Sequence, residues 1–184
     1  MGQPGDRSPA PGVLALVQDF VNTTDIEVGI DDMHTPADLA AFATAHGLRV
    51  DEYTETDVEV CRAAREALRD AAQANAGVDL DDGGALDALL ARGPLTVRIG
   101  ATGSVAVRPA EGLTGADLLL AEVAAAIVAS TAEGTWRRLK ACAMDSCRWV
   151  YYDKSPAGRS RWCTMSICGS RAKMRAYRDR IHSG

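Results

Sequence analysis

Apolar positions recur at helical spacing along most of the first 134 residues. The first run places Leu14, Val17 and Phe20 on one face of a helix, because residues three or four apart meet on the same side. The hydroxyl of Thr35 followed by Pro36 is typical of the start of a second helix. The pattern predicts five helices in this part of the chain, over about residues 13–21, 36–46, 56–75, 86–90 and 118–132.

Two of these helices differ in character. The helix over 56–75 opens with Thr56 and Glu59 at capping-box spacing. Its charged residues, Arg65 and Arg69 among them, are expected on a solvated face with local ion pairs. The helix over 118–132 is apolar on most sides, so we expect it in the domain core or against the partner subunit of a homodimer.

Alternation of apolar and polar residues marks the strands. Residues 95–108 alternate on both sides of a Gly100–Gly103 turn, which predicts a β-hairpin. Short extended stretches are expected at 136–141 and 149–152, and a final helix at 169–181. The predicted fold class is mainly α with a small β-hairpin (α+β).

Composition divides the chain into three parts. Residues 1–12 are turn-formers without periodicity and are expected to be a disordered lead-in. A helical N-terminal domain is expected over 13–134, and a small C-terminal module over 136–182. Residues 136–184 hold 12 Lys and Arg against three acids, whereas residues 1–135 hold 8 against 22. Only the C-terminal module therefore suits a polyanion.

Four of the five cysteines lie in the basic module as two matched pairs, Cys142/Cys147 and Cys163/Cys168. Two short turns brought face to face can give one zinc ion four thiolates, which closes its coordination and makes the site structural. We therefore predict one Zn²⁺ per chain. Two disulfides are the alternative, but no secretory signal is present and no apolar run is expected to span a membrane, so a reducing cytoplasm is expected. Cys61 is expected to be a small core residue.

The last predicted helix and the loop before it are rich in positive charge. A helix of this kind suits the major groove and the phosphates of DNA. The residues that we expect to contact DNA are Arg159, Arg161, Arg171, Lys173, Arg175 and Arg178. The alternative is a protein–protein adaptor, in which the same surface binds an acidic protein.

The sequence surrounding the second cysteine pair, from Ser160 to Arg175, resembles the signature of the CGNR zinc-finger family, a bacterial group of stress-induced transcription regulators. Residues 139–155 match as well, so the close match covers about 45 residues, and Leu14–Thr23 matches the start of the family's N-terminal domain more loosely. The resemblance implies a treble-clef-like zinc finger that binds DNA in the nucleoid. Ser170 stands in place of the family's name-giving asparagine, and serine lacks the separate carbonyl and amino groups of an amide.

The resemblance also implies a sensor for a small-molecule effector in the N-terminal domain. Phe20 and Asn22 are the expected ligand-binding residues, although Asn22 and Asp19 are also typical of capping and turn chemistry. His34 and His46 have no second histidine at i+3 or i+4, so surface or capping roles are expected for them. No catalytic motif is present, and we do not expect an enzyme.

Overall fold

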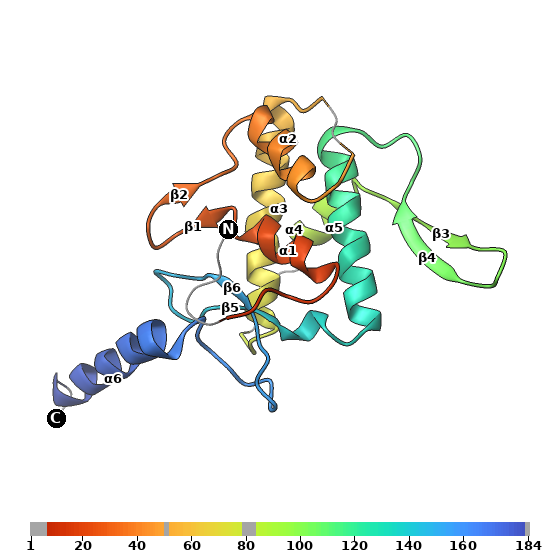
Figure 1. The fold of residues 1–184 in the computed structure, drawn as a ribbon. Coiled ribbons are helices and arrows are strands. Elements are labelled where there is room, and N and C mark those ends of the chain that lie inside the picture. The colour runs from red at the N-terminus through yellow and green to blue at the C-terminus, as the bar shows by residue number, and fades with distance from the viewer. Residues whose placement is uncertain (1–6, 50–51, 79–83, 183–184) are drawn as a thin grey trace.

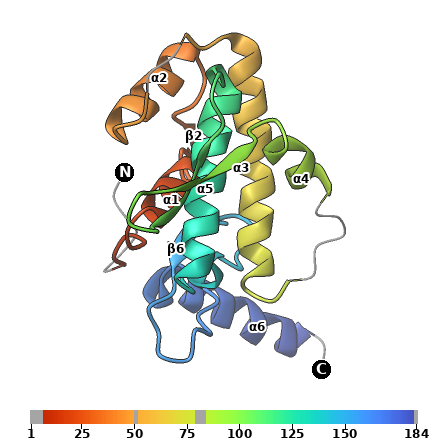
Figure 2. The same ribbon diagram turned by 90° about the vertical axis from the view of Figure 1, so that its right-hand side faces the viewer.

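The computed structural model of the chain describes residues 7–49, 52–78 and 84–182. Its centre is a pair of long helices, α3 (Glu55–Ala74) and α5 (Gly115–Ala132), that lie side by side (Figure 1). The first helix, α1, packs against both of them. Figure 2 shows the last helix, α6, at the foot of this body, below the ends of α3 and α5.

The other elements are short, and the described strands form three antiparallel pairs. The hairpin of β3 and β4 projects from one side of the molecule (Figure 1), and it confirms the predicted β-hairpin. The pair β1–β2 has only two residues in each strand, too few to show an alternating pattern. The bounds are α1 (Leu14–Val21), β1 (Thr24–Asp25), β2 (Ile30–Asp31), α2 (Pro36–Ala45), α4 (Gly84–Leu90), β3 (Leu95–Ile99), β4 (Val105–Pro109), β5 (Leu139–Ala141), β6 (Val150–Tyr152) and α6 (Ser170–His182). The fold is mostly helical with small strand pairs, as the sequence predicts.

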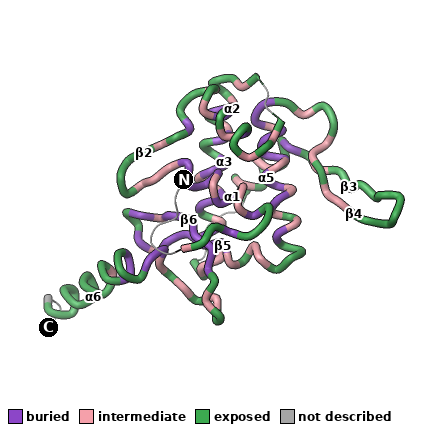
Figure 3. Tube along the Cα trace, viewed as in Figure 1, coloured by how far each residue is buried: buried purple, intermediate pink, exposed green. Residues whose placement is uncertain are grey.

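One hydrophobic core crosses the expected domain boundary near residue 135. Its N-terminal part comes from α1, α3 and α5, with the Phe20 and Phe42 rings packed edge to face. The same core takes in Leu139, Ala141 and Val150 from β5 and β6. Figure 3 shows buried residues both in the helices and in this strand pair. We call residues 7–134 the N-terminal body and residues 136–182 the zinc module, whose four cysteines lie with Met144, Trp149 and Tyr151 in a second, smaller buried cluster.

Helix α5 is long and apolar enough to cross a membrane by length and composition, contrary to the expectation that no such run exists. Its packing supports the first of the two placements that we considered, the domain core. It contacts α1, α3, α4 and β4, and residues around its whole circumference are buried. A helix surrounded in this way is apolar all round because nearly every side meets protein.

The expectation of a disordered lead-in is wrong for residues 7–12, while residues 1–6 lie outside the described part of the chain. Ala10 is buried, and its amide donates to the side-chain oxygen of Gln18 at 2.7 Å. Arg7 donates to the carbonyl oxygens of Trp162 and Cys163. A few specific polar contacts therefore order a segment whose Gly- and Pro-rich composition favours disorder.

The capping box of α3 lies two residues earlier than predicted. Thr54 Oγ1 accepts from the amide of Asp57, and Asp57 Oδ2 accepts from the amide of Thr54. The other carboxylate oxygen of Asp57 accepts from the amide of Ala116 at 2.8 Å. Asp57 thus caps α3 and the start of α5 together, which Glu59 cannot do from its exposed position.

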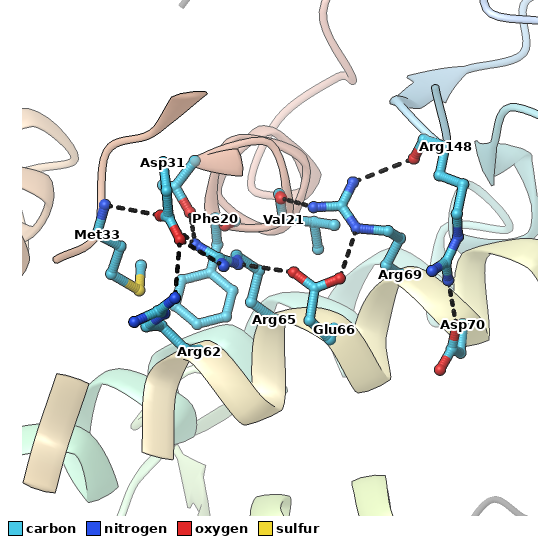
Figure 4. Close-up of polar contacts among 11 residues, drawn as sticks. Phe20, Val21, Asp31, Met33, Arg62, Arg65, Glu66, Arg69, Asp70 and Arg148 are labelled. Atoms are coloured by element: carbon cyan, nitrogen blue, oxygen red, sulfur yellow. Dashed lines mark hydrogen bonds and ion pairs between the residues drawn. The ribbon is translucent and has the colours of Figure 1, made fainter. Parts of the chain in front are cut away.

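Arg65 and Arg69 were expected on a solvated face, but both are buried, at 3% and 0% exposure. Arg65 makes a bidentate contact with Asp31, with Nη1 to Oδ1 at 2.6 Å and Nη2 to Oδ2 at 2.9 Å. Glu66 bridges the two guanidinium groups (Figure 4). Both arginines can be buried because carboxylates and carbonyls accept from them.

We predict that Asp57→Asn lowers the free energy of unfolding by about 1–2 kcal/mol at pH 7, because Asp57 accepts at both carboxylate oxygens and asparagine keeps only one acceptor oxygen. Burial raises the pKa of Asp57, but hydrogen bonds from Thr54 and Ala116 outweigh it and hold the pKa below its usual value. A lowered pKa contributes stability above about pH 4 that is lost as the pH falls further. The difference between wild type and variant should therefore shrink between pH 5 and pH 3.

Urea unfolding at several pH values measures this difference. Glu55→Gln is the matched control, because Glu55 lies in the same first turn of α3 but is exposed. Equal losses of stability in the two variants would contradict a shared cap on α3 and α5.

Candidate metal centre

The first cysteine turn lies at the end of the β5–β6 pair. Strand β5 runs directly into Cys142, whose amide donates to the carbonyl of Trp149 at 2.9 Å. The chain then turns so that the amides of Cys147 and Arg148 both donate to the carbonyl of Met144. Arg148 has a φ of 48°, an uncommon conformation for a residue with a side chain. The left-handed conformation of Arg148 lets the chain reverse into β6 directly after Cys147.

The second cysteine turn leads into α6. Cys163 precedes one π-helical turn, Met165–Gly169, which contains Cys168. A Cβ on Gly169 would lie 2.9 Å from the sulfur of Met165 and 3.2 Å from the ring of Trp162, so a larger residue there would displace the Met165 side chain. α6 continues from this turn, which places the last thiol at the start of the helix as predicted.

The four thiols Cys142, Cys147, Cys163 and Cys168 form one buried group, with all sulfurs within 4.8 Å of one another. The sulfur of Cys163 lies 3.7 Å from that of Cys147 and 3.6 Å from that of Cys168. Disulfide sulfurs are about 2 Å apart, whereas zinc–sulfur bonds of about 2.3 Å in a tetrahedron separate the sulfurs by about 3.8 Å. The geometry therefore fits a tetrathiolate metal site and does not fit the disulfide alternative.

The thiols resist multiple deprotonation without a cation. Hydrogen bonding with Cys147 and Cys163 lowers the pKa of Cys142 to about 2. The same contact raises the pKa of Cys147 to about 12, and hydrogen bonding with Cys142 raises that of Cys163 still more strongly. One thiolate is thus favoured and the others are opposed. A divalent cation at their centre reverses this opposition, because the metal-bound form of cysteine is the thiolate.

A buried ion pair organises the loop between the two cysteine pairs. Asp153 is fully buried and lies 3.1 Å from Nζ of Lys140. Its carboxylate also accepts from the amides of Ser155 and Ser160, and Lys140 donates to the carbonyl of Gly158. Burial raises the pKa of Asp153, but these donors together hold it well below its usual range. The loop that carries Arg159 and Arg161 is therefore folded around a charged side chain.

The predicted DNA-contacting residues are all exposed, but they lie on two separate segments. Arg171, Arg175 and Arg178 line one groove of about 480 Å³ together with Met144 and Ser146 of the first cysteine turn. Lys173 does not line this groove. Arg159 and Arg161 are in the loop, where the guanidinium of Arg161 lies over the ring of Trp162. Arg171 forms an ion pair with Glu27 of the β1–β2 turn.

The predicted ligand-binding residues, Phe20 and Asn22, are both fully buried. The side-chain nitrogen of Asn22 donates to the carbonyl of Val150 at 2.7 Å, and its oxygen accepts from the Val150 amide at 2.9 Å. The amide of Asn22 is thereby occupied by β6. A ligand role for these two residues stays a prediction that no contact in the structure supports.

Several polar contacts join the N-terminal body to the zinc module, and the sequence did not predict them. Arg7, Gln18 and Arg69 reach its backbone from the N-terminal body. Arg148 forms an ion pair with Asp70 of α3. Arg69 gives one usable signal, since it lies next to Leu68 and four residues after Arg65, at the edge of the buried stripe of α3. Arg7 gives none, being a lone cation in a turn-rich segment.

The π-helical turn also fixes Ser170, which occupies the place of the family's asparagine. Its hydroxyl donates to the carbonyl of Met165 at 3.2 Å, within the same turn. Serine therefore contributes a local contact at the start of α6. A second polar group, which asparagine would offer, has no counterpart here.

A helical body joined to a four-thiol finger, from which an exposed basic helix extends, is the architecture of a zinc-finger protein. The profile of the family described as "Putative stress-induced transcription regulator" (ABATE) matches residues 14–134, and that of the CGNR zinc finger matches residues 138–181. The chain belongs to this family and carries its zinc finger. The resemblance noted in the sequence is thereby confirmed. No curated protein matches the chain in sequence.

We predict that Cys163→Ser abolishes stoichiometric metal binding, since the hydroxyl of serine is a poor replacement for one of four thiolates. Elemental analysis of purified wild-type protein should find one zinc per chain. Cys61→Ala is the control, because Cys61 is buried in the N-terminal body and burial raises its thiol pKa to about 12. A wild-type protein that is folded in residues 136–182 but free of metal would contradict the assignment.

Proposed function

We propose that the protein is a cytoplasmic transcription regulator that binds DNA through α6 and contains one structural zinc ion. The observation that carries the proposal is the basic helix that begins at the metal centre. Every described side chain of α6 except Ala172 is exposed, and five of them are arginine or lysine. A cationic helix projecting from a rigid support suits the major groove and its phosphates.

The charges of α6 are unevenly distributed around its axis. Arg171, Arg175 and Arg178 follow one another at spacings of four and three residues and line the same groove, so they face one side. Lys173 is on the opposite flank, and Met174 and Tyr177 lie exposed between the two sides. The proposed DNA-contacting side is the one with three arginines, because clustered guanidinium groups can reach successive phosphates or base edges.

The charge of the N-terminal body limits how DNA can approach. Residues 1–135 carry 22 acids against 8 bases, so the body repels a polyanion. Arg159 and Arg161 extend the positive charge along the zinc module. DNA would therefore meet the foot of the molecule in Figure 1, where α6 and the zinc module lie, and not its helical centre.

We predict that Arg175→Glu weakens binding to genomic DNA fragments by about tenfold or more at low salt, since it replaces an attraction to phosphate with a repulsion. Zinc content should be unchanged. Arg98→Glu is the control, because Arg98 is equally exposed but lies on the projecting β3–β4 hairpin. Charge reversal at Arg65 is unsuitable as a control, because Arg65 is buried against Asp31 and its reversal would disturb folding.

Salt titration of the wild type separates this proposal from the adaptor alternative. A linear fall of log affinity with log salt indicates counterion release from DNA. Equal losses from Arg175→Glu and Arg98→Glu would show that overall charge, not α6, drives binding. A protein that binds no DNA at 50 mM salt would leave the zinc module as a surface for an acidic protein partner.

We also propose that the N-terminal body binds a cationic or neutral small-molecule effector beside α1 and α2. A hollow of about 380 Å³ there is lined by the carboxylates of Asp19, Asp32 and Asp38 and by His46. Burial raises the pKa of Asp19, which lies 3.7 Å from His46. Acidic groups in a concave site favour cations over anions. Phe20 and Asn22 do not line this hollow.

We predict that a screen of small amines identifies ligands that raise the melting temperature of wild type but not of Asp19→Asn. Binding to the folded state alone stabilises it by an amount that grows with the ratio of ligand concentration to dissociation constant. Asp87→Asn, on exposed α4, should retain the shift. A ligand acts as an effector only if it also changes DNA affinity. Stabilisation with unchanged DNA affinity would exclude a regulatory role for the hollow.

A further inference from the structure

The second cysteine turn is held from outside the zinc module by Arg7. The Nε of Arg7 donates to the carbonyl of Cys163 at 2.8 Å, and its Nη2 donates to the carbonyl of Trp162 at 2.9 Å. Its guanidinium also lies over the ring of Tyr151, with the carbon 4.5 Å from the ring centre. A residue more than 150 positions away thus fixes the backbone of a metal ligand.

Asn22 and Gln18 hold the strand that follows the first cysteine turn. Asn22 makes both hydrogen bonds of a strand neighbour with Val150, and Gln18 adds a third to the same carbonyl. Val150 pairs in register with Ala141, the residue before Cys142. All these groups are buried. The end of α1 therefore determines where β5 ends and where the thiol of Cys142 lies.

Arg69 holds the turn itself. Its side chain is fully buried on α3 and donates from Nη1 to the carbonyl of Arg148 at 3.1 Å, from Nη2 to the carbonyl of Val21, and from Nε to Glu66 (Figure 4). Arg148 is the left-handed residue directly after Cys147. Its own guanidinium pairs with Asp70, one residue along α3. The strained residue of the cysteine turn is thus fixed at its carbonyl and at its side chain.

We propose that Arg7, Asn22 and Arg69 are positioning residues of the zinc centre, so that zinc affinity and the packing of the N-terminal body depend on each other. Together they fix backbone atoms of Cys163 and of the residues adjoining Cys142 and Cys147. Fixing the ligand backbones before the ion arrives lowers the entropy lost on binding. In other metalloproteins, residues that hydrogen-bond to the metal ligands also change metal affinity. The proposal rests on the metal site of the proposed function and not on DNA binding.

The arrangement differs from a finger on a flexible tether, in which the metal alone organises the fold. Here the carbonyl of Arg148 satisfies a guanidinium that has no access to water. Rearrangement of the cysteine turn on zinc loss removes that acceptor, and a buried N–H donor left without an acceptor is costly. The cost falls on α3 and α1, which are parts of the N-terminal body. The stability of α1 and α3, which lie outside the finger, therefore depends on whether zinc is bound.

The test measures the zinc affinity of the full chain by competition with a coloured chelator, with no DNA present. Arg7→Met, Asn22→Asp and Arg69→Met should each weaken zinc binding by about 10- to 100-fold. Arg62→Met is the matched control: Arg62 is also on α3, but it is half exposed and the ion pair that it forms with Asp31 at 3.5 Å does not involve the zinc module. Its zinc affinity should equal that of wild type.

Arg69→Met can fail to fold, because it removes a buried charge from a network. Arg7→Met keeps the test decisive, since Arg7 lies in the segment before α1 and outside the helical core. Weaker zinc binding by Arg7→Met with an unchanged circular-dichroism spectrum supports the proposal. Wild-type affinity in both Arg7→Met and Asn22→Asp overturns it. Failure of DNA binding is a separate result, because Arg175→Glu is expected to keep its zinc.

Hydrogen exchange measures the reverse direction of the same dependence. Removing zinc by chelation should speed amide exchange in α1, which contains Val21, and in the second half of α3, which contains Arg69. α2 has none of these contacts with the zinc module and should change least. Unchanged exchange in α1 and α3 after zinc removal would show that the module is autonomous and would overturn the proposal.

Discussion

Four thiols within 4.8 Å of one another are the constraint on which the C-terminal quarter of this protein depends. Buried sulfurs at this separation cannot all be thiolates without a cation between them. Helix α6 has only 13 residues and packs chiefly against the π-helical turn that contains Cys168. An isolated helix of that length is marginal in water. A metal ion bound to Cys168 would therefore also determine where α6 starts and in which direction it projects.

Buried charges in this structure specify geometry more than they stabilise. Arg65, Arg69, Lys140 and Asp153 are all almost fully buried, and each has acceptors or donors in defined positions. Desolvation cancels much of the attraction in such pairs, so replacing them with apolar residues often costs little stability. What an apolar residue cannot supply is a donor to one particular carbonyl. Arg69, Lys140 and Asp153 each reach backbone that borders a cysteine turn or a loop, whereas Arg65 reaches the side chain of Asp31 in the β1–β2 pair.

The sequence was sufficient for features that local chemistry decides. Matched cysteine spacing, helical periodicity and the alternation of 95–108 each depend on neighbours a few residues apart, and all three were predicted correctly. Features decided by distant partners were not. Thr54 with Asp57 and Thr56 with Glu59 both satisfy the capping pattern, and only the contact of Asp57 with Ala116 selects the first. Arg65 and Arg69 look solvated until Asp31, Val21 and Arg148 are seen beside them.

The contact between α6 and the N-terminal body shows how the basic zinc module and the acidic body can act on each other. Arg171 pairs with Glu27 in the turn between β1 and β2, and both side chains are substantially exposed. Such a pair contributes only about 0.2–1 kcal/mol and weakens with salt. A phosphate that approached Arg171 could therefore replace Glu27 at little cost. On the proposed role of α6, the β1–β2 turn is then the part of the acidic body that first responds to bound DNA. Asp31 of the same pair contacts Arg65 on α3, which connects that response to the helix that holds the zinc centre.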